Sequence, residues 1–327
     1  MEYTTLGSTG VKVSRLCFGT MSFGSEADEA TSAAMYRRVR DAGINFFDTA
    51  NVYNGGASEE ILGRLTKEHR AEVVIATKAG NAMGDDPNAR GLSRRHLTSA
   101  VDASLKRLGT EWIDLYYVHT LDPATPIAET LETLDHLRRQ GKIHYLGVSN
   151  WAAWQIALAL GISAREHLAR FEAIQPMYNL VRRQVEVEIL PLAVDQGLAV
   201  VPYSPLAGGL LTGKYTSGSK PAAGRLIDSE RYADRYSQET DFTTAQRFSE
   251  LAAKLNVAPA SLGVAWVLAN PAITAPIIGA RNLTQLEGSL GALDIDMTPE
   301  LYQQISALSA TPPPATDRTE TQKARWK

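Results

Sequence analysis

Short apolar runs alternate with longer segments in which apolar residues recur every three or four positions, from residue 16 almost to the end of the chain. A short continuous apolar run bounded by turn residues is typical of a strand buried on both faces, and the longer periodic segments are typical of helices that bury one side. The pattern predicts eight strands, at residues 16–19, 45–48, 73–78, 113–119, 145–149, 173–175, 199–203 and 275–278.

The helical segments between these strands have recognisable ends. Ser93 is a suitable N-cap for the segment that follows it, and Gly109 comes directly after the last turn of that segment. Pro126 and Gly141 bracket the next helix in the same way. These boundaries support a regular alternation of strands and helices.

The alternation predicts an α/β protein with a parallel sheet covered by helices on its outer face, and eight such units close naturally into a (β/α)8 TIM barrel. Residues 3–6 and 11–13, joined by a turn at residues 7–10, predict a small N-terminal β-hairpin. Residues 208–240, after strand seven, are rich in Gly, Ser and Arg and predict a long functional loop. We expect a single domain over residues 1–327, in which residues 311–327 form a mobile tail.

Composition narrows the classes of function. A chain of 327 residues with 44% hydrophobic content can bury a full core, although length alone would also permit two domains. The 33 basic and 36 acidic residues give a net charge of −3, which offers no footprint for nucleic acid or an anionic membrane and favours a small, roughly neutral substrate. No apolar run approaches the ~20 residues that span a bilayer.

Cysteine and histidine usage adds two expectations. The single cysteine, Cys17, excludes an internal disulfide framework, and the first ten residues lack the features of a signal peptide, so we expect a cytoplasmic protein. The histidines show no H-E-x-x-H pairing and no cysteine partners at zinc spacing, so we expect no metal site.

Nearly every predicted strand delivers a polar residue at its carboxyl end. In a TIM barrel the active site lies at the carboxyl ends of the strands, so these side chains are candidate functional groups. In chain order they are Asp48 with Tyr53 five residues later, Lys78, His119, Ser149 with Asn150, Gln175, Tyr203 with Ser204, and Gly279 and Arg281 after the last strand.

Most of these residues also have a structural interpretation. Asp48 could cap the turn that follows it, His119 could be a satisfied core histidine, and Tyr53 could be ordinary loop packing. Lys78 is harder to explain in this way, because an ammonium directly after the apolar run VVIAT would be buried and would need a counter-charge or a depressed pKa. Asp48 is its natural partner.

Together these four side chains suit the reduction of a carbonyl group. Hydride adds to the carbon while the oxygen must acquire a proton, which a tyrosine can supply although its unperturbed pKa of about 10 makes it a reluctant acid at neutral pH. We expect Lys78 to lower the pKa of Tyr53, and Asp48 to hold the lysine charged and aimed. His119 would orient the carbonyl oxygen by a hydrogen bond.

Several segments are specific enough to indicate a family: GINFFDTANVYNGGASEEILGR, VVIATKAG, IDLYYVH, GKIHYLGVSNW, IQPMYNL and VVPYSPLAGGLLTGKY. They resemble the aldo-keto reductase superfamily, in its longer bacterial type related to the potassium-channel β-subunit-like reductases, and the likeness covers nearly the whole chain. The resemblance implies an NADPH-dependent oxidoreductase that reduces aldehydes and activated ketones to alcohols. It places Asp48, Tyr53, Lys78 and His119 on the family's catalytic tetrad, with Tyr53 as the proton donor.

The resemblance also implies a cofactor, NADPH with NADH as a weaker alternative, and the residues that contact it. The implied contacts are Gly19, Thr20 and Met21 near the nicotinamide, Ser149, Asn150 and Gln175 on its carboxamide, Tyr203 stacked on the ring, Ser204, Pro205, Leu206 and Lys214 along the pyrophosphate, Arg281 and Arg225 at the 2′-phosphate, and Gly279 and Gln285 nearby. Guanidinium groups suit a phosphate because they donate two parallel hydrogen bonds.

One part of the pattern departs from the family. Many members carry an acidic residue and an asparagine near the adenine, whereas this chain has Gly288 and Ser289 at the corresponding places. Either Gln285 alone donates to the adenine, or the cofactor binds more loosely.

Two other functions are alternatives. Potassium-channel β-subunits hold NADPH and turn over poorly, but they tend to carry Asn at the position of His119, so the complete tetrad favours turnover here. A barrel lyase could use Lys78 as a Schiff-base nucleophile, but a carboxylate partner such as Asp48 would keep the lysine protonated. The loops at the barrel mouth single out no particular substrate, and the surface helices leave the oligomeric state open.

Overall fold

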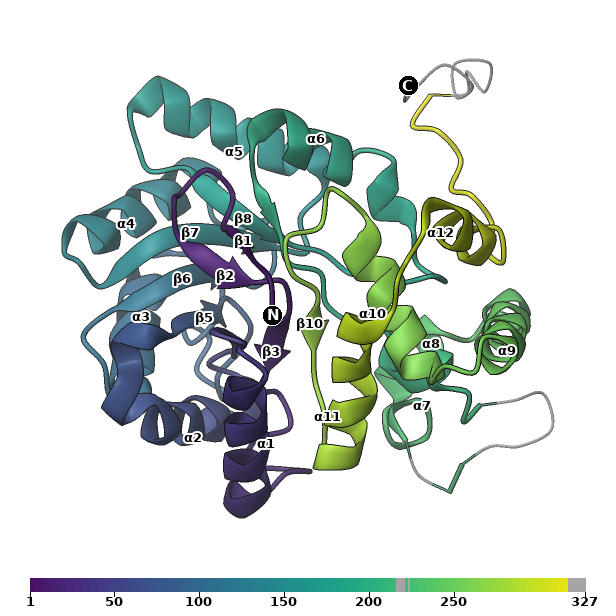
Figure 1. Ribbon diagram of the computed structural model, residues 1–327. Coiled ribbons are helices and arrows are strands. Elements are labelled where there is room, and N and C mark those ends of the chain that lie inside the picture. Colours follow the sequence, from purple (N-terminus) through teal and green to yellow (C-terminus); the bar gives the residue numbers. More distant parts are fainter. Residues whose placement is uncertain (216–220, 223, 317–327) are drawn as a thin grey trace.

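A computed structural model describes residues 1–215, 221, 222 and 224–316, and it shows a parallel β-barrel with helices around it (Figure 1). The strand order is β10-β3-β4-β5-β6-β7-β8-β9. The strands are β3 (Cys17–Gly19), β4 (Phe46–Asp48), β5 (Val74–Ala79), β6 (Ile113–Val118), β7 (Ile143–Ser149), β8 (Phe171–Gln175), β9 (Ala199–Val200) and β10 (Ile277–Ile278). Backbone hydrogen bonds from Thr274 N to Val200 O (2.9 Å) and from Ile277 N to Pro202 O (2.8 Å) join β9 to β10 and close the barrel.

The predicted barrel is confirmed, and the strands differ from the prediction at their ends. β7 and β8 begin at Ile143 and Phe171, each two residues earlier than the apolar pattern predicts. β9 ends at Val200 rather than residue 203, because Pro202 has no N–H to donate to a regular ladder. Beyond it the chain makes an isolated bridge between Met177 and Tyr203.

The predicted hairpin is formed by β1 (Tyr3–Thr5) and β2 (Lys12–Ser14), and it covers the amino-terminal end of the barrel. Gly7 in its turn has φ 56°, and a Cβ there would lie 2.8 Å from the carbonyl oxygen of Glu172. Leu6 and Val13 of this hairpin pack against the barrel interior. The remaining interior side chains are Cys17, Phe46, Val74, Ala76, Leu115, Tyr117, Ala173, Ala199, Val201 and Ala275.

Helices form the outer layer and enclose a second, larger apolar core between themselves and the strands. They are α1 (Glu29–Asp41), α2 (Ala57–Thr66), α3 (Arg94–Leu108), α4 (Ile127–Arg139), α5 (Ala153–Glu166), α6 (Ile189–Gln196), α9 (Glu239–Lys254), α10 (Pro259–Ala269), α11 (Leu283–Leu290) and α12 (Pro299–Ser306). The Ser93 side chain accepts a hydrogen bond from the first turn of α3, and Gly109 ends that helix with φ 62°, as predicted. Pro126 precedes α4 directly.

The long segment after β9 has more regular structure than its composition predicts. It contains the 3₁₀ turn η4 (Ala207–Thr212) and two short helices, α7 (Arg225–Asp228) and α8 (Glu230–Arg235), which lie beside α9 in Figure 1. Residues 216–220 and 223 of this predicted loop, and residues 317–327 of the predicted tail, lie outside the described residues.

Among the helices of the described ranges, none alone has the length and hydropathy to cross a membrane. α9 and α10 meet those criteria only when taken together, and the two helices are bent by 102° relative to each other.

Candidate active site

Neighbouring strands carry ionisable side chains at the carboxyl end of the barrel interior. Alternate residues of a strand share a face, so Lys78 continues the inward-facing row that contains Ala76, and His119 continues the row that contains Tyr117. In the strand register Asp48 lies opposite Ala76, and Lys78 lies opposite Tyr117. The regular pleat therefore directs these groups toward one point.

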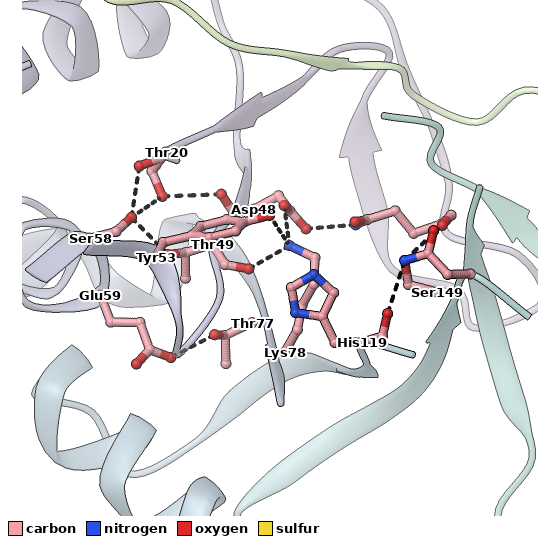
Figure 2. Close-up of polar contacts among 12 residues, drawn as sticks. Thr20, Asp48, Thr49, Tyr53, Ser58, Glu59, Thr77, Lys78, His119 and Ser149 are labelled. Carbon is pink, nitrogen blue, oxygen red and sulfur yellow. Dashed lines mark hydrogen bonds and ion pairs between the residues drawn. The ribbon is translucent and has the colours of Figure 1, made fainter. Parts of the chain in front are cut away.

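Lys78 is the centre of this group and is fully buried. Its ammonium nitrogen lies 2.5 Å from Oδ1 of Asp48, 2.6 Å from the carbonyl oxygen of Thr49 and 3.3 Å from the hydroxyl of Tyr53 (Figure 2). Three acceptors match the three N–H donors of the ammonium. The other carboxylate oxygen of Asp48 accepts a hydrogen bond of 2.7 Å from the Gln175 side chain. The predicted Asp48–Lys78 pair is thus present.

Tyr53 reaches the lysine from a tight turn, η1 (Tyr53–Gly56), that follows β4. Asn54 in this turn has φ 51°, an uncommon left-handed conformation for a residue with a side chain. Its side-chain amide donates to the carbonyl oxygens of Met21 (2.9 Å) and Phe23 (2.7 Å). Asn54 therefore ties the Tyr53 turn to the loop after β3, a role that the sequence pattern did not reveal.

The pKa of Tyr53 differs from the expectation in its net direction. Burial raises the pKa of the Tyr53 phenol above its ordinary value, and the opposing effect of Lys78, although present, is smaller. Lys78 therefore lowers the pKa of Tyr53 as expected, but this effect is smaller than the rise caused by burial. Burial lowers the pKa of Lys78, but the effects of Asp48 and Tyr53 together outweigh it, so the lysine pKa is raised. At neutral pH the phenol is protonated beside a charged ammonium.

His119 lies beside this pair, with its ring edge-on to the Tyr53 ring at a centroid distance of 6.1 Å. Burial, followed by the charges of Lys78 and Arg231, lowers the pKa of His119 to about 3. The imidazole is therefore neutral at physiological pH and carries one N–H that can donate. Its buried Nδ1 has no hydrogen-bond partner within the described part of the chain.

These side chains open into a cavity of about 770 Å³. Asp48, Tyr53 and His119 line it. Of the residues expected at a cofactor, those that line it are Gly19, Met21, Ser149, Asn150, Gln175, Tyr203, Ser204, Pro205, Leu206, Lys214, Arg225, Gly279, Arg281 and Gln285. Thr20 does not: it is buried, and its hydroxyl lies 2.8 Å from that of Ser58.

One wall of the cavity is a chain of hydrogen bonds at the ends of β7, β8 and β9. The Tyr203 hydroxyl donates to Oδ1 of Asn150 (2.8 Å), and the Asn150 amide donates to the carbonyl oxygen of His119 (2.9 Å). The Ser149 hydroxyl donates to the carbonyl oxygen of Gln175 (2.9 Å). Asn150, at φ 60°, adopts the left-handed conformation that is rare outside glycine and is often found at functional sites.

Another part of the cavity lining is cationic and contains Lys214, Arg225 and Arg281. Burial lowers the pKa of Lys214, and the nearby charges of Arg281 and Arg225 lower it further. Arg281 is partly compensated by Glu26 at 3.3 Å and Asp228 at 3.7 Å. Three cations whose charges are only partly neutralised by acidic residues suit a multiply charged anion such as a nucleotide phosphate.

The cavity also contains residues that the sequence pattern missed. Arg231, Tyr232 and Arg235 of α8 belong to its lining, together with Asn81 and Thr120. α8 lies inside a segment that the composition predicts to be a loop, so no periodicity marked its arginines as facing an active site. Their basic character was the one available signal.

Comparison with known proteins agrees with this architecture. A model of the Aldo/keto reductase family matches residues 15–310. The chain is 39% identical to the "Uncharacterized oxidoreductase YrpG" of Bacillus subtilis (strain 168), over 95% of this chain and 97% of that protein. It is 37% identical to a "Probable voltage-gated potassium channel subunit beta" of Oryza sativa subsp. japonica, over 97% and 99% of the two chains. It is 33% identical to the "Versiconal hemiacetal acetate reductase" of Aspergillus parasiticus, over 93% and 96%.

Proposed function

This chain belongs to the aldo/keto reductase family and is an oxidoreductase, and from that premise we propose that it reduces aldehydes and activated ketones to alcohols with NADPH. The observation that carries the proposal is the contact of a buried, charged Lys78 with Asp48 on one side and the Tyr53 hydroxyl on the other. A tyrosine beside a fixed cation can release a proton to a carbonyl oxygen, because the phenolate that forms is stabilised at once.

The residues present fit a nicotinamide dinucleotide. The cavity joins a catalytic end at Tyr53 to a cationic end at Lys214, Arg225 and Arg281, as a cofactor with a reactive ring and distant phosphates requires. Tyr203 belongs to the same lining and offers an aromatic face. When bound, NADPH supplies the hydride that adds to the carbonyl carbon. We assign the 2′-phosphate to Arg281 and Arg225, which favours NADPH over NADH.

In the proposed mechanism Tyr53 donates its proton to the carbonyl oxygen as the carbon receives hydride, so that C=O becomes CH–OH and the phenol becomes a phenolate. Lys78 stabilises that phenolate, and Asp48 holds the lysine charged. Neutral His119 donates its N–H to the carbonyl oxygen and orients it. A proton from solvent then restores Tyr53.

The proposal is tested by following the loss of NADPH absorbance with a panel of aldehydes and ketones, for the wild type and for Tyr53→Phe. We expect the variant to lose kcat by at least about 100-fold, in line with the usual contribution of a proton donor, while NADPH still binds. Tyr145→Phe is a matched control, since Tyr145 is a partly buried tyrosine outside the cavity lining. Undiminished turnover in Tyr53→Phe would contradict the proton-donor role.

A binding or regulatory function is the second candidate, because relatives named as potassium channel β-subunits match almost the whole chain. NADPH binding without turnover of any carbonyl would support that function. The lyase alternative is disfavoured by the 2.5 Å contact between Lys78 and Asp48. If borohydride traps substrate covalently on Lys78, the result would support the lyase alternative.

We further propose that residues 1–327 form one domain and that the protein works in the cytoplasm.

A further inference from the structure

Two arginines of α8 line the catalytic end of the cavity without an assigned role. Arg231 and Arg235 are four residues apart on one short helix, so they lie on the same side of it. Both belong to the cavity lining that includes Tyr53 and His119. The acidic residues of the same helix, Glu230 and Asp234, do not belong to it.

Neither arginine forms an ion pair within the described residues. Nearby arginines are paired: Arg182 lies 2.7 Å from Asp241, and Arg183 lies 2.9 Å from Glu186. Arg231 and Arg235 instead flank the ring of Tyr232, with guanidinium-to-centroid distances of 5.4 and 5.2 Å. Two like charges on one wall of a cavity repel each other, and an anion bound between them would offset that repulsion.

This pair adjoins the cations assigned to the phosphates, because the Arg225 guanidinium lies 5.5 Å from the centroid of the same Tyr232 ring. The charge of Arg231 acts on His119 and Tyr203, whereas Lys214 is influenced by Arg225 and Arg281. The cationic lining is therefore continuous around Tyr232, and Arg231 is the arginine in it whose charge acts on His119. A dinucleotide whose phosphates occupy Lys214, Arg225 and Arg281 would leave Arg231 and Arg235 for the other ligand.

We propose that Arg231 and Arg235 bind a carboxylate of the substrate, so that the substrate class is an aldehyde or ketone that also carries an acid group. This inference rests on the proposed carbonyl reduction, and it replaces the roughly neutral substrate that the net charge suggests. Net charge is a property of the whole chain, whereas recognition depends on the charges that line the cavity. A guanidinium suits a carboxylate because it can donate two parallel hydrogen bonds to it.

The test compares two aldehydes of nearly the same shape, 4-carboxybenzaldehyde and its neutral amide, 4-formylbenzamide. We expect the wild type to prefer the acid by about tenfold in kcat/KM, because a charged hydrogen bond is worth about that factor or more. Arg231→Gln and Arg235→Gln should each lower the acid-to-amide ratio several-fold, chiefly through KM, since the contact is made before and during reaction alike. Arg231→Lys should restore part of the ratio.

Arg247→Gln is the matched control, because Arg247 is an exposed arginine of α9 outside the cavity lining and its loss changes the net charge equally. Its acid-to-amide ratio should equal that of the wild type. Added salt should reduce the preference of the wild type for the acid, because Arg231 is exposed to solvent.

The outcomes separate this inference from the proposed function. Equal turnover of acid and amide, with a ratio that Arg231→Gln and Arg235→Gln leave unchanged, would overturn the inference and leave the reductase proposal standing. A loss of NADPH affinity in both variants with an unchanged ratio would assign the arginines to the cofactor and also overturn it. No turnover of either aldehyde would overturn both proposals.

Discussion

The buried ion pair at Lys78 determines which substitution gives a clean test of mechanism. Removing Asp48 would leave an uncompensated ammonium in a fully buried site, a loss that typically costs about 3–5 kcal/mol of stability. Removing the Tyr53 hydroxyl breaks one hydrogen bond of 3.3 Å and leaves two acceptors on the lysine. An inactive Tyr53→Phe protein would therefore report on chemistry, whereas an inactive Asp48→Ala protein could be unfolded.

His119 makes a prediction about acid stability. Its folded pKa of about 3 is far below the ordinary value of about 6.5, so between these values the unfolded chain binds a proton that the folded protein does not. The free energy of unfolding therefore falls as the pH drops from about 6.5 toward 3. His119→Gln, which cannot titrate, should lose about 2–3 kcal/mol less than the wild type between pH 7 and pH 4.5. Urea unfolding at the two pH values measures this, and equal losses would show that His119 is not held neutral.

The neutral state of His119 also leads to a prediction about how activity depends on pH. Because burial, Lys78 and Arg231 keep His119 neutral, we expect no limb with a histidine-like pKa in the dependence of kcat/KM on pH between 5 and 8. If Tyr53 is the proton donor, as we propose, its raised pKa means that activity is lost on the alkaline side of that range. A steady-state pH profile with a substrate that does not itself ionise checks both statements.

At the scale of elements, the packing of α2 on α3 depends on close contact at one glycine. A Cβ on Gly63 of α2 would lie 2.3 Å from the carbonyl oxygen of Leu108, the last residue of α3. The obstacle is backbone, so relief would require one of the helices to move. Gly161 of α5 offers the contrast, because a Cβ there meets no atom within 4 Å.

We therefore predict opposite effects of one substitution at two helical glycines. Gly63→Ala should lower the free energy of unfolding by about 1–3 kcal/mol, despite the helix propensity that alanine adds, because the backbones must separate. Gly161→Ala should raise it by about 0.5–1 kcal/mol, since the propensity gain is unopposed. Urea unfolding curves of both variants give the two values. A stabilised Gly63→Ala protein would mean that α2 and α3 are not held at this distance.

At the scale of the whole molecule, cofactor binding couples to the stability of the barrel. A ligand that binds the folded state raises Tm by an amount that depends on its concentration relative to Kd. Lys214, Arg225 and Arg281 come from the segment after β9 and the loop after β10, so a bound phosphate would link these parts of the chain.

We predict that NADPH raises Tm more than NADH does at equal concentration. Arg281→Ala should weaken NADPH binding by about ten- to a hundredfold and NADH binding much less, because the arginine is assigned to the 2′-phosphate. The unliganded stability should change little, since its partners Glu26 and Asp228 are substantially exposed. Thermal unfolding with each cofactor measures the difference, and equal losses for NADPH and NADH would contradict the assignment.

Much of the architecture can be predicted because it depends on short stretches of consecutive residues. Apolar runs and helix boundaries such as Ser93 and Gly109 depend on a few consecutive residues, so the barrel and its hairpin could be predicted. The same holds for Asp48 and Lys78, because a polar residue at the end of a buried strand must point to the carboxyl end of a parallel barrel. Strand ends were less accurate where a single residue such as Pro202 interrupts the ladder.

The tertiary structure alone decided what depends on distance between remote residues. The net direction of the Tyr53 pKa follows from burial by many neighbours, which outweighs the one cation that the sequence brings to it. Thr20 turns toward Ser58 rather than the cavity, and Asn54 ties the turn that carries Tyr53 to the loop after β3. The arginines of α8 become candidates for ligand binding only because folding places that helix in the cavity lining. Pattern along a chain specifies which faces are buried, whereas the field inside a cavity is a sum over residues that folding brings together.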